Sequence, residues 1–280
     1  GSDAEWDGIV WKSAIAVIPY TLYLQTGRKE IVEENIEAMY RYIKYLDSVD
    51  FRYANANKVI QTEKALPGKT GFLADWLGRV ETDETLINHA YYVYMLKIAS
   101  EMAGIAGQKE MESELCSMHE LAKNAWNTIY IDEKNGMTRG ADGKIQNTQA
   151  SYAVPLSLNV ISEKTAQKAA ENLDRLIKEP QPGKEGEGGE ILPYTLTTGF
   201  AGTSNLVKAL SKYGYADTAN RLLQSKDYAS WLYPVVLGAT SIWERFDSYT
   251  EETGFGNNHM NSFNHYALGA VFEWMMEYQL

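Results

Sequence analysis

Amphipathic helical segments follow one another in pairs with short joins, and this pattern limits what the chain can fold into. The clearest segment runs from Lys29 to Leu46. Its apolar residues recur at steps of four, three, four and three, which places them on one face of a helix. These residues are Val32, Ile36, Met39, Ile43 and Leu46. Acidic residues crowd the first turns of the same segment, where negative charge suits the helix dipole.

About ten helices are predicted, with little strand. They cover residues 11–26, 29–46, 84–106, 109–130, 148–158, 162–177, 202–213, 216–224, 227–237 and 262–280. The first is apolar enough to be a buried helix, with Pro19 as a kink or break and Gly27 as its stop. Consecutive helix pairs fit either a helical solenoid or a closed α/α toroid. A solenoid requires self-similarity at a fixed period. The sequence has none, and its very unequal loops favour an all-α toroid with a site at one mouth.

Two long segments lack helical periodicity. Residues 51–82 contain one proline and three glycines, and a loop of this length in a compact domain is usually functional or mobile. Residues 180–189 are too rich in glycine and charge to pack, and no strand precedes them, so they do not form a nucleotide-binding motif. Asn135-Gly136 and Asp142-Gly143 predict turns, with a small hairpin between them.

Length and charge exclude several functions. The 280 residues are enough for one large domain with a sizeable core. With 26 basic and 37 acidic residues the net charge is −11. The chain therefore lacks the basic surface that a nucleic-acid-binding protein needs, and its charge suits a neutral ligand. No run of 18 apolar residues predicts a membrane span. The single cysteine, Cys116, cannot form an internal disulfide, and the oligomeric state stays open.

The most informative run is residues 238–247, in which Glu244 stands between Trp243 and Arg245 after a predicted helix end at Gly238. A carboxylate beside an aromatic ring and a guanidinium suits a group that meets a ligand and stays ionised, because a nearby cation favours the charged form. The alternative is a surface ion pair of Glu244 with Arg245. The 19 Tyr and seven Trp fit a carbohydrate cleft as well as a large core with tyrosines at its rim.

Six runs of sequence carry a resemblance to a known family. The most specific are residues 238–245 (GATSIWER) and 262–270 (SFNHYALGA). The others are residues 11–23 (WKSAIAVIPYTLY), 74–77 (ADWL), 198–203 (TGFAGT) and 227–233 (DYASWLY). Taken in their order along the chain, the six runs resemble the C-terminal half of the catalytic domain of bacterial α-L-rhamnosidases, glycoside hydrolase family 78. The resemblance implies an (α/α)6 barrel of twelve helices in a bacterial protein. Whether that protein is cytoplasmic, periplasmic or secreted stays open.

The resemblance also implies a reaction and a site. It implies a hydrolase that releases terminal α-L-rhamnose from an oligosaccharide or glycoside. The enzyme inverts the anomeric configuration with two carboxyl groups of its own and uses no cofactor, and Glu244 matches its general base. The residues expected to bind the substrate are Trp11, Asp75, Trp76, Arg245 and His265. His265 follows Ser262, a predicted N-cap, so the helix dipole favours a neutral ring that can donate to one group and accept from another. Core packing remains the alternative for Trp11 and His265. The other histidines have no partner at metal-ligand spacing, so no metal is predicted.

One part of the family's pattern is not found. Its general acid lies in a segment rich in Asp, Arg and Glu before the match to Trp11, and Asp3, Glu5 and Asp7 do not form that segment. Ten predicted helices are also about two short of twelve. We therefore expect residues 1–280 to form a single (α/α)6 domain that is incomplete at its N-terminus, with the acid upstream. Such a piece would expose apolar helix faces and have little activity alone.

Two other functions stay open. The first is a non-catalytic carbohydrate-binding or scaffold toroid, which the missing acid favours. The second is another α/α-toroid glycosidase or a lyase that acts on glycans containing uronic acids. That function needs basic residues for the substrate carboxylate, and Arg245 is the one cation that the sequence places near the predicted site.

Overall fold

The structure is a computed structural model that describes residues 8–49, 51–54, 57–60, 74–183, 190–256 and 259–278. Its α-helices in these ranges are α1 (Ile9–Lys12), α2 (Ala14–Thr26), α3 (Lys29–Val49), α4 (Glu84–Ile105), α5 (Lys109–Tyr130), α6 (Gln149–Ser157), α7 (Glu163–Lys178), α8 (Phe200–Lys212), α9 (Ala216–Gln224), α10 (Leu232–Val236) and α11 (Val271–Tyr278). A 3₁₀ helix, Ala267–Ala270, precedes α11. Strand is confined here to two hairpins, β1 (Phe51–Ala54) with β2 (Asn57–Ile60) and β3 (Tyr249–Thr250) with β4 (Gly254–Phe255). In the described part of the chain, no helix combines the length and the apolar composition needed to cross a bilayer.

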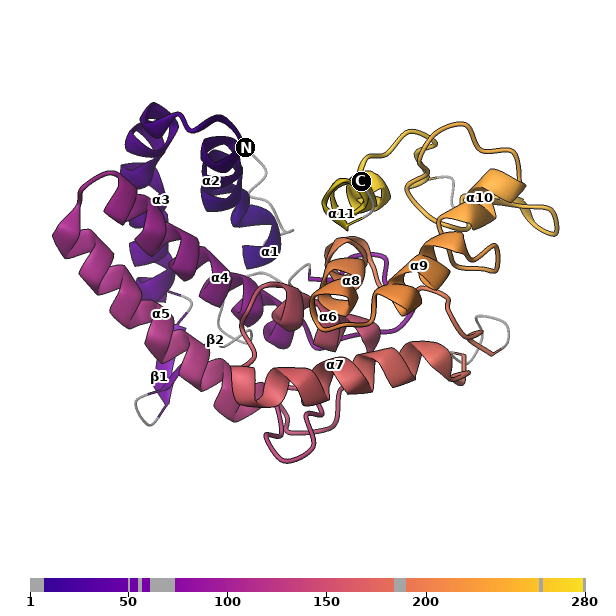
Figure 1. The fold of residues 1–280 in the computed structure, drawn as a ribbon, viewed down its shortest axis with the longest axis horizontal. Coiled ribbons are helices and arrows are strands. Elements are labelled where there is room, and N and C mark those ends of the chain that lie inside the picture. Colours follow the sequence, from indigo (N-terminus) through magenta and orange to yellow (C-terminus); the bar gives the residue numbers. More distant parts are fainter. Residues whose placement is uncertain are drawn as a thin grey trace.

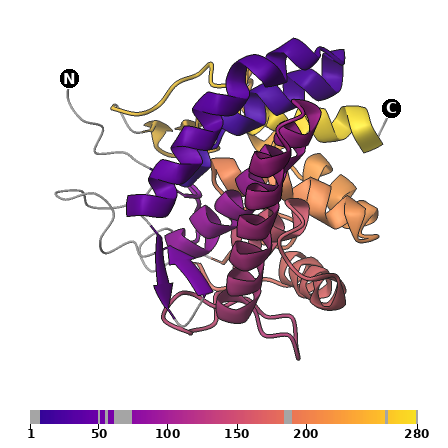
Figure 2. The same ribbon diagram turned by 90° about the vertical axis from the view of Figure 1, so that its left-hand side faces the viewer.

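The helices pack as consecutive hairpins that follow an arc (Figure 1). Helix α2 packs on α3, α4 on α5, α6 on α7 and α8 on α9. Helices α4, α6, α8 and α11 contact one another in that order along the inside of the arc, and α5 and α7 lie outside them. Figure 2 shows the β1–β2 hairpin near one end of α5, on which β2 packs. This two-layer order confirms an all-α fold of the toroid type.

The core lies between the two layers of helices. Helix α4 is buried along most of its length, because it contacts α1, α2, α3, α5 and α6. The apolar face predicted for residues 29–46 is confirmed, since all five of its residues are buried in α3. Trp126 and Trp274 are fully buried. The indole N–H of Trp126 donates to the carbonyl oxygen of Leu86 at 3.0 Å, so its polar atom is also satisfied.

The first predicted helix differs from the expectation. Residues 11–26 belong to two helices, α1 and α2, which are divided at Ser13. Pro19 lies inside α2 without ending it, and Gly27 caps α2 with a φ of 67°, as predicted. The prediction of a buried helix was wrong, because no element in the described ranges covers one face of α2. Three large apolar side chains on α2 are exposed, namely Ile18, Leu22 and Leu24.

The predicted loops are partly confirmed. Gly136 and Gly143 have φ of 72° and 78°, and isolated bridges join the segments around these turns. The segment 51–82 is not a continuous loop, because it contains the β1–β2 hairpin. Residues 61–73 of that segment, and residues 184–189 of the second predicted loop, lie outside the described residues.

Replacement of Trp126 tests the core. Trp126→Ala leaves a cavity between α4 and α5 and removes the donor to Leu86, so we expect the free energy of unfolding to fall by about 3–5 kcal/mol. Leu121→Ala on the same helix is the control, because Leu121 is 45% exposed. Chemical denaturation followed by circular dichroism measures both variants. Equal losses in the two variants would contradict this description of the core.

Candidate active site

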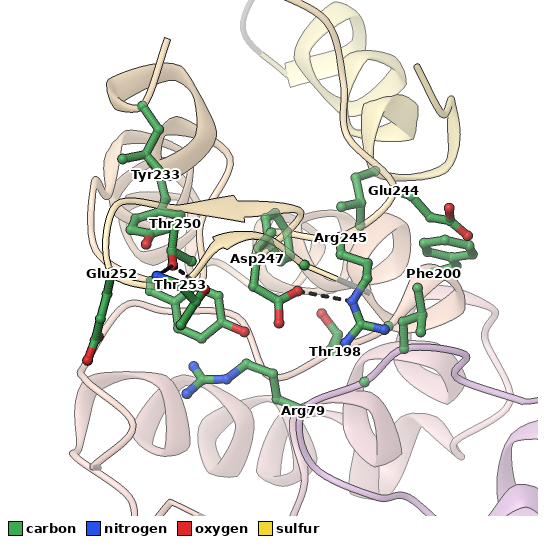
Figure 3. Close-up of a pocket in the computed structure, with 18 of the residues that line it drawn as sticks. Arg79, Thr198, Phe200, Tyr233, Glu244, Arg245, Asp247, Thr250, Glu252 and Thr253 are labelled. Atoms are coloured by element: carbon green, nitrogen blue, oxygen red, sulfur yellow. Dashed lines mark hydrogen bonds and ion pairs between the residues drawn. The ribbon is translucent and has the colours of Figure 1, made fainter. Parts of the chain in front are cut away.

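A cavity of about 830 Å³ lies between three segments that are far apart in the sequence (Figure 3). Its lining comes from residues 77–79, from residues 198–200 at the start of α8, and from residues between 228 and 268 that include the β3–β4 hairpin. The volume falls in the upper part of the usual range for small-molecule pockets, roughly 300–1,000 Å³. The cavity is therefore large enough for more than one sugar ring.

The carboxylate of Asp75 joins the first two of these segments. Its Oδ2 accepts a hydrogen bond from the N–H of Gly199 at 2.8 Å, and its Oδ1 accepts one from the N–H of Gly202 at 2.6 Å. These N–H groups lie at the N-terminus of α8, where the helix has unpaired donors and a positive dipole end. Burial nevertheless raises the pKa of Asp75 to about 6, although the backbone N–H groups lower it. Both oxygens of a residue predicted to bind substrate thus bond to the protein itself.

The loop with Asp75 approaches α8 so closely that glycine is required at position 199. A Cβ atom on Gly199 would lie 2.1 Å from the carbonyl oxygen of Trp76 and 2.5 Å from that of Asp75. The same oxygen of Trp76 accepts a hydrogen bond from the N–H of Phe200 at 2.9 Å. Trp76 is therefore bonded to the cavity wall through its backbone, while its ring is not part of the lining.

Phe200 brings two of the predicted substrate-binding residues together. Its ring stacks on the imidazole of His265, with centroids 4.9 Å apart, and meets the indole of Trp11 edge-on at 6.4 Å. Phe200 itself lines the cavity. Trp11 is 37% exposed, which argues against the alternative that it is a core tryptophan. The three rings form one aromatic group beside the cavity, contributed by α1, α8 and the segment before the 3₁₀ helix.

Glu244 lines the cavity, and its carboxylate is held on one side. Its N–H donates to the carbonyl oxygen of Ser262 at 2.8 Å, and its Oε2 accepts from the N–H of Ser262, also at 2.8 Å. The residue is only 9% exposed. Its second oxygen has no hydrogen-bond partner within the described ranges. Figure 3 shows this carboxylate beside the ring of Phe200.

Arg245 lines the same cavity but turns away from Glu244. Its Nε lies 3.0 Å from Oδ1 of Asp247, with which it forms an ion pair. The side chains of Glu244 and Arg245 diverge (Figure 3). The ion pair between these two neighbours, which the sequence left as an alternative, is therefore absent from the structure.

His265 lies before the last helix rather than in its first turn, so the predicted start at Ser262 was wrong. Regular structure begins at Ala267, because the preceding segment bonds instead to residues 242–244. The N–H of His265 donates to the carbonyl oxygen of Ile242 at 2.8 Å. Its Nδ1 accepts from the N–H of Ala267 at 3.3 Å, so a neutral ring carries its proton on Nε2. Nε2–H is then a donor for a ligand.

Phe200 and Arg79 are among the lining residues that sequence reasoning did not propose for the site. Phe200 belongs to the run at 198–203, and Arg79 follows Trp76 by three positions, but neither spacing indicated a position in a cavity. Arg79 is a second cation in the cavity lining, whereas the sequence analysis placed only Arg245 near the site. Among the described residues, no group of three or more His, Cys, Asp or Glu side chains is arranged to hold a metal ion.

Comparison with known proteins shows which family the chain belongs to. Residues 3–278 match the family model described as the bacterial alpha-L-rhamnosidase 6 hairpin glycosidase domain. The chain belongs to this family. An α-L-rhamnosidase of Formosa agariphila is 30% identical over 275 residues, which cover 95% of this chain and 26% of the relative. An α-L-rhamnosidase of Streptomyces avermitilis is 30% identical over 267 residues, with coverage of 95% and 22%. The chain thus spans about a quarter of the length of these relatives.

Solved structures of α-L-rhamnosidases share the fold of this six-hairpin glycosidase domain. The enzyme of Aspergillus terreus superimposes with a TM-score of 0.79 at 28% identity, covering 99% of this chain and 30% of that one. The enzyme of Streptomyces avermitilis, complexed with L-rhamnose, gives 0.76 at 29% identity, covering 94% and 22%. The family inferred from residues 238–245 and 262–270 is therefore confirmed.

The pKa of Asp75 predicts a pH dependence of stability. A folded-state pKa of about 6 lies above that of an exposed aspartate, so the folded chain holds this proton more tightly than the unfolded chain. The resulting stabilisation, roughly 2–3 kcal/mol, is present below about pH 4 and is lost as the pH rises through 6. Asp75→Asn has no such proton. We expect the stability advantage of the wild type over Asp75→Asn to be smaller at about pH 7.5 than at about pH 4.5 in urea denaturation.

Asp217→Asn is the control for this experiment, because Asp217 is exposed on α9. Its difference from the wild type should change little over the same interval. A wild-type advantage over Asp75→Asn that stayed constant or grew with pH would contradict the raised pKa of Asp75.

Proposed function

We propose that the protein hydrolyses terminal α-L-rhamnosides with inversion at the anomeric carbon, and that Glu244 is the general base. The orientation of the Glu244 carboxylate carries this proposal. One oxygen is fixed by the N–H of Ser262 at 2.8 Å, and the other has no partner among the described residues. A carboxylate held in this way can accept a proton from a water molecule without first breaking a bond to the protein.

The proposed reaction needs two carboxyl groups on opposite faces of the sugar. Glu244 takes a proton from water as the water oxygen attacks the anomeric carbon, and an acid gives a proton to the departing glycosidic oxygen. In inverting enzymes the two groups stand roughly 6.5–9.5 Å apart, which leaves room for that water. The bond between sugar and leaving group breaks as the bond to water forms, so the configuration inverts.

We place the general acid outside these 280 residues. The described cavity has three other carboxyl groups, those of Asp247, Glu251 and Glu252. Asp247 is paired with Arg245. Glu251 and Glu252 are exposed in the turn between β3 and β4. None of them is buried in an apolar site that would keep it protonated. The relatives are about four times longer than this chain, which supports an acid supplied by another part of the protein.

The aromatic group beside Glu244 fits a deoxy sugar. Rhamnose has a methyl group at C6, and the rings of Phe200 and Trp11 can remove that methyl from water, at roughly 25 cal/mol per Å² of apolar area buried. Nε2–H of His265 is placed to donate to a sugar hydroxyl, because Nδ1 already accepts from Ala267. The names of the relatives, and the L-rhamnose bound to one solved enzyme, support rhamnose as the sugar.

Replacement of Glu244 tests the base separately from the acid. A dinitrophenyl α-L-rhamnoside has a leaving group that departs without a proton, so its hydrolysis requires the base alone. We expect this chain to hydrolyse it much faster than the unactivated phenyl rhamnoside. Glu244→Gln should lower kcat for the dinitrophenyl substrate by about 100- to 10,000-fold, the usual effect of removing a general base. Binding of L-rhamnose, measured by calorimetry, should remain.

Glu110→Gln is the matched control, because Glu110 is exposed on α5. Wild-type kcat in Glu244→Gln would overturn the assignment of the base. A protein extended at its N-terminus should also hydrolyse the phenyl rhamnoside, since it would contain the acid. If that protein bound L-rhamnose saturably and hydrolysed neither substrate, the non-catalytic carbohydrate-binding toroid would be the better description.

A further inference from the structure

Arg79 is a cation of the cavity wall that has no acidic partner in the part of the chain that the structure describes. Its guanidinium lies over the ring of Tyr228, with Cζ 4.5 Å from the ring centroid. Its Nη1 is buried, and no described residue accepts a hydrogen bond from it. The residue as a whole is partly exposed and lines the cavity. Stacking on Tyr228 engages the face of the guanidinium and uses none of its in-plane N–H donors.

A buried charged donor without an acceptor is costly, because the group loses water and gains nothing in exchange. Arg245 shows the usual solution in the same cavity, an ion pair with Asp247. Arg79 instead presents a planar fork of N–H donors, the geometry that matches a carboxylate through two parallel hydrogen bonds. A ligand carboxylate would supply the acceptor that the described residues do not.

The acidic residues of the cavity would repel an anion, but the repulsion from each is reduced by pairing, by solvent screening or by distance. Asp247 is neutralised by Arg245. Glu251 and Glu252 are exposed in the turn of the hairpin, where water and salt screen their charge. Glu244 lies on the opposite side of the cavity from Arg79 in Figure 3, with the Arg245–Asp247 pair between them. An anion beside Arg79 is therefore closer to that cation than to the base.

We infer that Arg79 determines specificity by binding the carboxylate of a uronic acid that follows the terminal rhamnose, an inference that rests on the proposed function. The cavity has room for a second ring, since its volume is about 830 Å³. Rhamnose at the Glu244 end places the next sugar toward Arg79. The preferred substrate is then a rhamnosyl-uronic acid unit rather than a rhamnoside of a neutral sugar.

Binding of two matched disaccharides tests this inference. The probes are α-L-rhamnosyl-(1→4)-D-glucuronic acid and α-L-rhamnosyl-(1→4)-D-glucose, which differ only in the carboxylate. For the wild-type chain we expect Kd to be about 10- to 100-fold lower for the uronic acid, as for a charge-assisted pair of hydrogen bonds. Arg79→Gln should reduce this ratio to within about threefold. Arg79→Lys should keep part of it, because a point charge remains without the fork.

Arg221→Gln is the control, because Arg221 also lies over a tyrosine ring, that of Tyr194 at 3.7 Å, but belongs to α9 and is not part of the cavity lining. It should leave the ratio unchanged. Equal binding of the two disaccharides by the wild type, or a preference that survives in Arg79→Gln, would overturn the inference and leave the proposed function intact. A carboxylate preference that depends on Arg79, together with no binding of L-rhamnose and no turnover of any rhamnoside, would refute the proposed function instead.

Discussion

The cavity depends on one buried carboxylate, that of Asp75. Its two oxygens accept the N–H groups of Gly199 and Gly202, which are more than 120 positions away in the sequence. This contact caps α8 from outside the helix and fixes the loop on either side of Asp75. Trp76 then bonds to Phe200 through its carbonyl, and the loop continues to Arg79. A single capping interaction thus sets the wall of the cavity and the position of Arg79.

A second cross-link between distant segments positions the proposed base. The segment 242–244 bonds to residues 262–265 through three backbone N–H groups, and one of them holds the Glu244 carboxylate. Residues 262–265 also include His265, whose ring stacks on Phe200, so the two cross-links meet at one aromatic ring. Because Ser262 and Ile242 contribute only backbone groups to these bonds, their side chains matter less than the close approach of the two segments. The geometry of the site is therefore a property of how the loops pack on the helical arc.

The sequence predicted long amphipathic helices such as α3, because a period of 3.6 residues is a local property. It did not predict the break at Ser13 or the start of the last helical segment at Ala267. It predicted Glu244 and His265 through family resemblance, and the structure brings both to one cavity or its edge. The prediction for Asp75 illustrates the limit, because a carboxylate that caps a distant helix looks the same in sequence as one that meets a ligand. Arg79 was missed for a related reason, since its place in the wall follows from contacts across more than a hundred positions. Local patterns carry no information on such contacts.

The two arginines of the cavity show how its charges are divided. Arg245 is adjacent to Glu244 in sequence, yet it pairs with Asp247, so the proposed base does not have a cation as its direct partner. Arg79 lies away from the base and has no described acidic partner, so its charge is available for recognition. Arg245 therefore balances an acidic residue of the cavity wall, whereas Arg79 is the cation that an anionic sugar would meet.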